Sequence, residues 1–189
     1  MPDTFTFHND IEVAASAVKQ GKIIAYPTEA VYGLGCDPFN EEAVSHLIAL
    51  KKRDPHKGLI LVASSWDHIE PLIDPIEPAA RMNIDMHWPG PITYVFPKSR
   101  FAPHWITGHH NTIAIRMSAH PIVKQLCEYV GHAVVSTSAN VEGFPPIRDV
   151  RTLTMSFGND VAMIVPGNLG GALNPSQIVD AVTGETFRA

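Results

Sequence analysis

Apolar residues along this chain recur at two spacings. In several segments they stand three and four positions apart, which places them on one face of a helix. Capping residues and helix breakers bound these segments. The predicted helices are one capped by Asn9 or Asp10 and ended by Gly21, one from the cap Asn40 to Lys51, a short one over 66–73, one over 78–87, one over 121–130, and one from the cap Asp149 to Phe157.

Shorter apolar runs predict buried strands. They cover residues 23–26, 59–63, 93–96, 112–117, 134–135, 161–165 and 177–182. Within 112–117, Ile113 and Ile115 fall on one face of the strand and Arg116 on the other. Helix and strand patterns alternate, and no linker or repeat divides the chain. We therefore expect an α/β fold in which residues 1–189 form a single domain, with a twisted, open, mixed parallel and antiparallel sheet flanked by helices.

Two segments between these elements contain several glycines. Residues 28–35 follow Pro27, which ends a strand, and contain Gly33 and Gly35. They predict a loop whose backbone adopts positive φ or approaches a ligand, and by composition a candidate lid. Residues 167–171 match neither GxGxxG nor GxxxxGK[ST], so a plain turn is the better interpretation there.

Composition narrows the class of protein. Hydrophobic residues make up 45% of the chain and charged residues 17%, which is typical of a globular protein. No apolar run approaches the roughly 20 residues of a membrane span. The first residues, Met1 to Thr4, lack the basic and apolar regions of a leader. We expect a cytoplasmic protein without membrane contact.

Cysteine and histidine usage argues against a metal site. Cys36 and Cys127 stand alone without CxxC spacing, so buried free thiols are expected rather than a disulfide framework. The ten histidines include His109 and His110 but no HExxH motif, so no metal ligands are predicted. A net charge of −5 requires any nucleic-acid contact to come from a local basic patch.

Polar residues follow the strand at 134–135 in a run of small side chains, Ser136-Thr137-Ser138-Ala139-Asn140. Such a run at a strand end lets ligand oxygens approach the backbone closely. It equally fits a turn whose side chains bond to their own backbone, which is the better interpretation of this stretch considered alone. Ser138 is outside any GxSxG motif, which leaves a hydrolase with little support.

Basic residues cluster after one predicted helix and inside one predicted strand. Lys51, Arg53 and Lys57 either interact with the helix dipole, which is worth ~0.3–1 kcal/mol per cation, or clamp a polyphosphate. Arg116 has apolar neighbours and therefore needs a carboxylate or phosphate partner from the protein or a ligand. With Lys52, the cluster also suggests an RNA-binding module, although the net charge and the lack of an aromatic stacking motif count against it.

Five segments together resemble the YrdC-like family. They are Tyr26 to Gly35, Lys51-Lys52-Arg53, Trp88 to Thr93, Ala114 to Met117 with His120-Pro121, and Ser136 to Asn140. They occur in one order from about residue 10 to the C-terminus. Lys51/Arg53 and Ser138/Asn140 match the family's KxR and SxN elements, and the length resembles its short bacterial form.

The resemblance implies an L-threonylcarbamoyladenylate synthase, which uses L-threonine, bicarbonate and ATP and releases pyrophosphate. Mg²⁺ would be carried mainly by the nucleotide. The product would pass transiently to the complex that transfers threonylcarbamoyl to the tRNA adenosine beside the anticodon, and a weak tRNA contact is possible in such a pathway.

The resemblance also implies roles for individual residues. Lys51 and Arg53 would be catalytic through their charge over the phosphates. The implied ATP-binding residues are Lys51, Arg53, Lys57, Thr112, Ser138, Asn140, Pro146 and Arg188. The implied threonine-binding residues are Thr28, Arg116, Ser136 and Ser176. Val62 departs from the family, because longer relatives often carry a threonine-contacting histidine there. No residue is an obvious general base.

Overall fold

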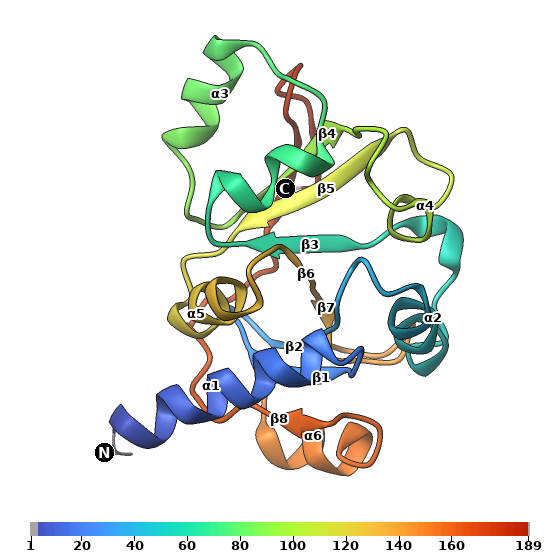
Figure 1. Ribbon diagram of the computed structural model, residues 1–189, viewed down its shortest axis with the longest axis vertical. Helices are drawn as coiled ribbons and strands as arrows, with labels where there is room; N and C mark the ends of the chain where they lie inside the picture. Colours follow the sequence, from blue (N-terminus) through green and yellow to red (C-terminus); the bar gives the residue numbers. More distant parts are fainter. Residues whose placement is uncertain (1–3, 189) are drawn as a thin grey trace.

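The computed structural model describes residues 4–188, and the expected mixed α/β fold is confirmed. Its ten strands form two hydrogen-bonded sheets rather than one (Figure 1). The helices are α1 (Thr4–Lys19), α2 (Glu41–Leu50), α3 (Pro78–Asp85), α4 (His104–Thr107), α5 (Pro121–Val130) and α6 (Val150–Phe157). Among the described residues, no helix is long and apolar enough to cross a membrane.

Helix boundaries follow the predicted caps with one exception. The side chain of Asn40 accepts from the amide of Ala43 at 3.0 Å. Asp149 likewise accepts from Thr152 at 2.8 Å, so both predicted caps are confirmed. The predicted cap at Asn9 or Asp10 is wrong, because α1 already begins at Thr4. The expectation that Met1 to Thr4 carry no leader falls mainly on residues 1–3, which lie outside the described residues.

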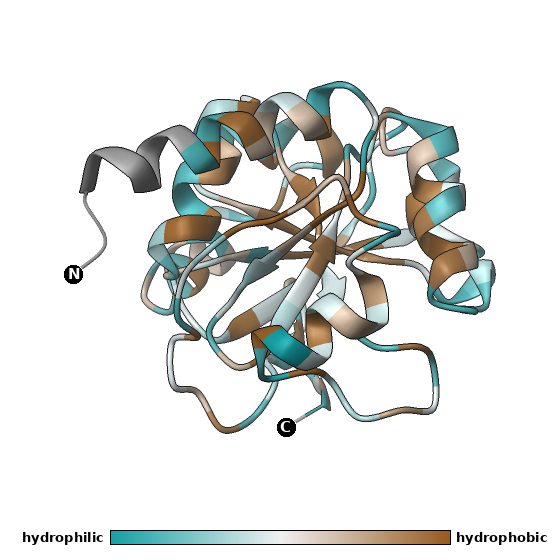
Figure 2. Cartoon of the chain, turned by 90° about the horizontal axis from the view of Figure 1, so that it is seen from below, coloured by the Kyte–Doolittle hydropathy of each residue, from teal (hydrophilic) through white to brown (hydrophobic). Residues whose placement is uncertain are grey.

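The larger sheet has six strands in the order β10-β9-β4-β5-β3-β6. Their bounds are β3 (Ile60–Ala63), β4 (Ile92–Pro97), β5 (Thr112–Met117), β6 (Val134–Val135), β9 (Gln177–Asp180) and β10 (Thr186–Arg188). Alternate residues of β5 are buried, as predicted, and Ile113 and Ile115 join the main core. The core lies at the centre of the molecule, and helices with mixed hydrophilic and hydrophobic surfaces surround it (Figure 2).

The smaller sheet has four strands in the order β7-β2-β1-β8. They are β1 (Ile24–Pro27), β2 (Tyr32–Gly35), β7 (Thr137–Ser138) and β8 (Met163–Ile164). Because α5 packs on both β3 and β1, it joins the two sheets. A second apolar cluster of α1, α5, β1 and β6 residues fills the space beneath this helix.

Several predicted elements are shorter or differ in type. The helix predicted over 66–73 is two 3-10 turns, η2 (Trp66–His68) and η3 (Glu70–Leu72), which suits a segment interrupted by Pro71. The strand predicted over 161–165 pairs only at β8, and the one over 177–182 ends at Asp180. The short α4 and β10 were not predicted, because neither has enough residues to show a hydrophobic period.

The loop predicted over residues 28–35 is correct for residues 28–31, but residues 32–35 form β2, and the lid stays a prediction. A four-residue turn joins β1 to β2 as an antiparallel hairpin, in which Pro27 pairs with Tyr32. All four residues of β2 are buried, and neither glycine has positive φ. Gly35 instead allows a close approach, since a Cβ there would lie 2.5 Å from the carbonyl oxygen of Val135 and 2.8 Å from the ring of buried Tyr26.

The polar run after β6 carries the chain from one sheet to the other. Val135 pairs with Leu61 in the six-stranded sheet, whereas Ser138 pairs with Gly33 in the four-stranded sheet. Ser136 lies between them, and its amide donates to the carbonyl of Ile60 at 2.9 Å. The segment therefore closes the gap between the sheets on one side, as Figure 1 shows at the centre of the molecule.

Gly35→Ala is expected to destabilise the protein by about 1–3 kcal/mol, the usual cost of overpacking a core. Both obstructing groups are fixed, one being backbone and the other a fully buried ring. The measurement is urea unfolding followed by circular dichroism. Gly33→Ala is the matched control, because its Cβ would meet the methyl of Thr28 at 3.2 Å and should cost less. Equal losses in the two variants would contradict this account.

Candidate active site

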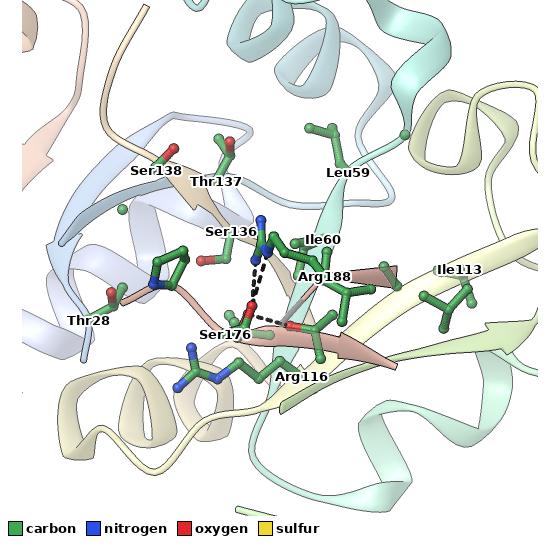
Figure 3. Close-up of a pocket in the computed structure, with 18 of the residues that line it drawn as sticks. Thr28, Leu59, Ile60, Ile113, Arg116, Ser136, Thr137, Ser138, Ser176 and Arg188 are labelled. Atoms are coloured by element: carbon green, nitrogen blue, oxygen red, sulfur yellow. Dashed lines mark hydrogen bonds between the residues drawn. The ribbon is translucent and has the colours of Figure 1, made fainter. Parts of the chain in front are cut away.

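A cavity of ≈ 560 Å³ lies between the two sheets. Alternate residues of the larger sheet form its floor, and their side chains point away from the main core. They are Ile60 and Val62 of β3, Thr93 and Val95 of β4, and Thr112, Ala114 and Arg116 of β5. Ser136, Thr137 and Ser138 line the facing wall (Figure 3). The sheet crossing thus supplies one side of a solvent-accessible cavity.

Most residues implied by the family resemblance line this one cavity. They are Thr28, Arg53, Lys57, Thr112, Arg116, Ser136, Ser138, Ser176 and Arg188. Figure 3 shows Thr28, Arg116 and Arg188, from three distant parts of the chain, around the same space. Lys51, Asn140 and Pro146 are not among the lining residues. The ATP-binding and threonine-binding roles of all these residues, whether or not they line the cavity, stay predictions.

Lys51 lies behind the wall rather than in the cavity. It is 3% exposed. Its ammonium donates to the carbonyl oxygens of Ser138 and, at 2.7 Å, of Asn140. Burial, with a smaller contribution from nearby Arg53, lowers the pKa of Lys51 to about 8. In this structure the first lysine of the KxR element holds the backbone of the SxN element in place.

The turn that carries this lysine has an unusual backbone. Lys52 has a φ of 52°, in the left-handed region that side chains other than glycine rarely adopt. The amide of Lys52 donates to the carbonyl of Ala49, and that of Arg53 to Ile48, so the turn closes the end of α2. As a result, Lys51 is buried and Arg53 reaches the cavity.

Asn140 stabilises the segment that follows the wall. Its side-chain oxygen accepts from the hydroxyl of Ser138 at 2.6 Å. Its amide nitrogen donates to the carbonyls of Val141 at 3.0 Å and Phe144 at 2.8 Å. These bonds fix the direction in which the hydroxyl of Ser138 points. Asn140 therefore shapes the cavity indirectly, by orienting Ser138.

The two other basic side chains of the cluster reach the cavity from the same end. A terminal nitrogen of Arg53 donates to the carbonyl of Gly58 at 2.9 Å, while its Nε is buried without a partner among the described residues. Lys57 forms an ion pair with Glu142. Lys57 is also the main reason that the pKa of Glu142 lies below its ordinary value. An anion entering here would meet Arg53 directly and would compete with Glu142 for Lys57.

This arrangement bears on the predicted RNA-binding patch. Lys51 is buried, Arg53 faces the cavity and Lys57 is paired with a carboxylate. Lys52 is exposed, but a single lysine supplies little of the charge density that holds a phosphate backbone. The observed geometry therefore favours a compact anionic ligand over a long one.

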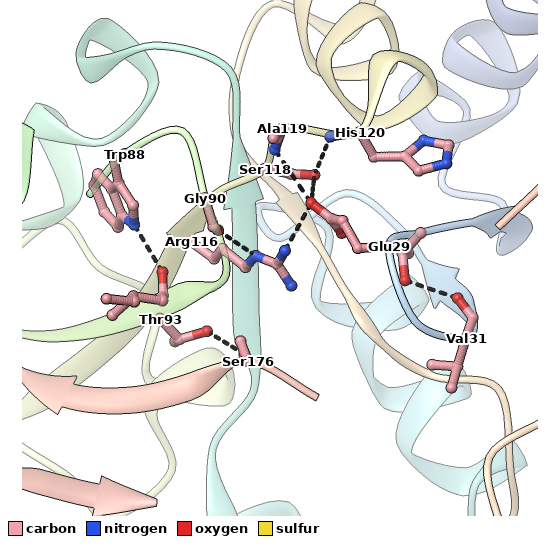
Figure 4. A network of polar contacts seen from close by, with 12 residues as sticks. Glu29, Val31, Trp88, Gly90, Thr93, Arg116, Ser118, Ala119, His120 and Ser176 are labelled. Atoms are coloured by element: carbon pink, nitrogen blue, oxygen red, sulfur yellow. Dashed lines mark hydrogen bonds and ion pairs between the residues drawn. The ribbon is translucent and has the colours of Figure 1, made fainter. Parts of the chain in front are cut away.

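Arg116 finds its partner in Glu29. Its Nη2 lies 2.7 Å from Oε1 of Glu29, and its Nε donates to the carbonyl of Gly90 at 2.9 Å (Figure 4). Burial lowers the pKa of Arg116, and the carboxylate of Glu29 partly offsets this effect. Glu29 was missed as a site residue, although the need of Arg116 for a carboxylate could have directed attention to it.

Hydroxyl groups and a third arginine line the cavity beside β4 and β9. The hydroxyls of Thr93 and Ser176 lie 2.8 Å apart, and both residues are buried. Arg188 donates from Nε and Nη2 to the carbonyl of Ser176, at 3.1 and 2.6 Å. A bulge-like register shift in β10 accompanies the position of Arg188. Thr93 was not predicted, because nothing in its local sequence distinguishes it from a core threonine.

Neither cysteine takes part in the site. Cys36 and Cys127 are buried free thiols, as predicted. Burial raises the pKa of each to about 12, so both are protonated near neutral pH. Among the described residues, no group of three or more His, Cys, Asp or Glu side chains is arranged to hold a metal ion.

Lys51→Met should change how stability depends on pH. In the folded wild type, Lys51 loses its proton near pH 8, whereas in the unfolded chain it does so near 10.5. The unfolded state therefore binds more protons between these values, so wild-type stability should rise with pH relative to the variant, by on the order of 2–3 kcal/mol. Urea unfolding at pH 7.5 and pH 10 measures this difference. Parallel profiles for the two proteins would rule out a buried, titrating Lys51.

Comparison with known proteins agrees with this geometry. A family model named Sua5_yciO_yrdC, described as telomere recombination, matches residues 16–189. A protein of Coxiella burnetii named threonylcarbamoyl-AMP synthase is 53% identical over 182 residues, which cover 96% of this chain and 98% of the relative. An Escherichia coli protein of the same name is 47% identical over 180 residues, covering 94% of each chain.

Solved structures give the same result. The chain matches a P. abyssi Sua5 variant with a TM-score of 0.88 and 33% identity over 95% of its length, but spans 52% of that longer protein. P. abyssi Sua5 complexed with L-threonine matches with a TM-score of 0.85 and 34% identity, over 92% of this chain and 51% of that protein. On the extent of these matches, the chain belongs to the Sua5/YciO/YrdC family.

Proposed function

We propose that this protein is a threonylcarbamoyl-AMP synthase, which joins L-threonine, bicarbonate and ATP and releases pyrophosphate. The observation that carries the proposal is that one cavity has Arg53 and Lys57 at one end and Arg116, paired with Glu29, at the other. The names of the bacterial relatives and the threonine complex of P. abyssi Sua5 support the same activity.

The nucleotide end is formed by positively charged and hydroxyl groups. Arg53 lines the cavity and its Nε has no partner among the described residues, while Lys57 has an ammonium that a phosphate could attract away from Glu142. Thr112, Ser138 and Arg188 line the same cavity. Mg²⁺ would arrive with the nucleotide and reduce the negative charge of its phosphates. Lys51 and Asn140 would contribute by holding Ser138.

The threonine end is formed around Arg116. Its Nη1 makes no hydrogen bond to the described residues, which leaves it free to donate to a carboxylate. Thr28, Ser136 and Ser176 surround the same volume. Val62 is the neighbour of Arg116 in the sheet register and presents an apolar surface beside it, which suits the methyl group of threonine.

The reaction needs alignment more than covalent help. Threonine's amine and bicarbonate combine into a carbamate with loss of water. A carbamate oxygen then bonds to the α-phosphorus of ATP as the bond from that phosphorus to the β-phosphate bridging oxygen breaks, and pyrophosphate leaves. Fixed cations such as Arg53 stabilise charge on the phosphates, and a rigid cavity keeps the carbamate in line with its target.

The product's later path lies outside the cavity. A carbamoyl adenylate is a reactive mixed anhydride, so it would pass to the tRNA-modifying complex soon after release. Such a route requires the protein to work in the cytoplasm, near that complex. A weak direct contact with tRNA would fit the same path, with Lys52 available on the surface.

Pyrophosphate release is expected only when ATP, threonine, bicarbonate and Mg²⁺ are all present. Omission of threonine or bicarbonate should reduce release to the level without enzyme. Ser138→Ala should raise the KM for ATP about tenfold, as expected for a lost hydrogen bond of about 1.4 kcal/mol. Asn140→Ala should act in the same direction, because it releases the hydroxyl of Ser138.

Lys52→Ala is the control for these variants, because Lys52 is exposed and outside the cavity lining. It should retain wild-type turnover and KM. Circular dichroism should give the same thermal midpoint for Ser138→Ala as for the wild type. Wild-type KM for ATP in both Ser138→Ala and Asn140→Ala would show that the 136–140 segment is only a turn.

A further inference from the structure

The charges that line the cavity are unevenly distributed. Its basic residues with permanent charge are Arg53, Lys57, Arg116 and Arg188. Glu29 is the sole acidic residue among the lining residues that the structure describes. It lies beside Arg116, with 17% of its side chain exposed against 13% for the arginine. A positively charged group of a substrate inside this cavity therefore has one carboxylate available to it.

The two oxygens of that carboxylate have different surroundings. Oε1 accepts from the hydroxyl of Ser118 at 2.7 Å and the amide of Ala119 at 3.2 Å, and it also pairs with Arg116 (Figure 4). Oε2 makes no hydrogen bond with any residue that the structure describes. The carboxylate is thus held firmly through one oxygen and keeps the other free as an acceptor.

The nitrogen atoms of Arg116 likewise differ in whether they have a partner. Nε donates to Gly90 and Nη2 pairs with Glu29, while Nη1 has no partner among the described residues. The pair as a whole has no net charge, so it would attract a simple carboxylate only weakly. A ligand with one positive and one negative group next to each other would be complementary to both free atoms.

We propose that Glu29 and Arg116 together recognise the amino-acid zwitterion. Oε2 of Glu29 accepts from the α-ammonium group, and Nη1 of Arg116 donates to the α-carboxylate. The inference rests on the proposed function and deepens it, because it assigns a binding residue for the ammonium group, which becomes the nucleophile once it has lost a proton to solvent. It makes the cavity selective for α-amino acids over carboxylates that lack the ammonium group.

A purely structural role for Glu29 makes a different prediction. If the carboxylate only anchored Arg116 and the residues before α5, its loss would weaken every ligand that uses Arg116. If it also binds the ammonium group, its loss weakens threonine specifically. The two roles are distinguished by a ligand that keeps the carboxylate, hydroxyl and methyl groups of threonine but has no amine.

The test compares L-threonine with (R)-3-hydroxybutyrate by isothermal titration calorimetry, in wild type and Glu29→Gln. Glutamine keeps an oxygen for Ser118 and Ala119 and removes the charge. The wild type should bind threonine at least about tenfold more tightly than the hydroxy acid, and Glu29→Gln should abolish most of this preference while binding of the hydroxy acid holds or improves. An equal loss for both ligands in Glu29→Gln would overturn the proposal.

Ser118→Ala is the matched control, because it removes a bond to Oε1 and leaves the charge of Glu29 in place. It should change the affinity for both ligands in parallel. A measurement on the wild type keeps the proposal testable if Glu29→Gln does not fold. N-acetyl-L-threonine lacks the positive charge and should bind at least about tenfold more weakly than threonine.

The outcomes separate this inference from the proposed function. Binding of threonine by the wild type without preference over the two ligands that lack an ammonium group would overturn the inference and leave the function standing. An absence of threonine binding by the wild type, with and without ATP, would overturn both.

Discussion

The close approach of β6 to the hairpin of β1 and β2 is the constraint on which the rest of this structure depends. The carbonyl of Val135 lies where a side chain at Gly35 would be, against the buried ring of Tyr26. Because the backbones approach this closely, the chain can pair with one sheet at Val135 and with the other at Ser138. The cavity exists on account of this crossing, and its wall is the crossing segment itself.

Lys51 and Arg53, the two basic residues of the KxR element, have different roles. Lys51 places a buried ammonium under the backbone oxygens of the wall, and Arg53 faces the cavity. A buried cation is stable only where oxygens surround it, so the lysine and the wall depend on each other. The left-handed backbone of Lys52 makes the side chains of Lys51 and Arg53 point in different directions. One of the charges that maintain the cavity, the ammonium of Lys51, therefore lies behind the residues that line it.

Sequence patterns predicted the fold class, most elements and two helix caps, because burial periodicity and capping are local properties. These patterns did not predict the division into two sheets, because the alternation of apolar and polar residues does not show which strands pair. The strand β2, Tyr32–Gly35, was missed because glycine there serves packing rather than a turn. In the site, the motifs drew attention to Arg53 and Arg116, which both line the cavity, but the burial of Lys51 and its pairing partners, like the pairing of Glu29 with Arg116, depend on contacts distant in sequence.

The pairing of β1 with β8 and of β4 with β9 has a consequence for folding. Both pairs are parallel and join strands far apart in the chain, so their formation closes long loops of high entropic cost. Chains dominated by such distant pairs fold slowly. Ser176 leads into β9, and Arg188 lies on β10, which pairs with β9. The cavity is therefore complete only after these distant strands have paired. Ligand binding at this site thus reports that the whole chain has reached its native topology.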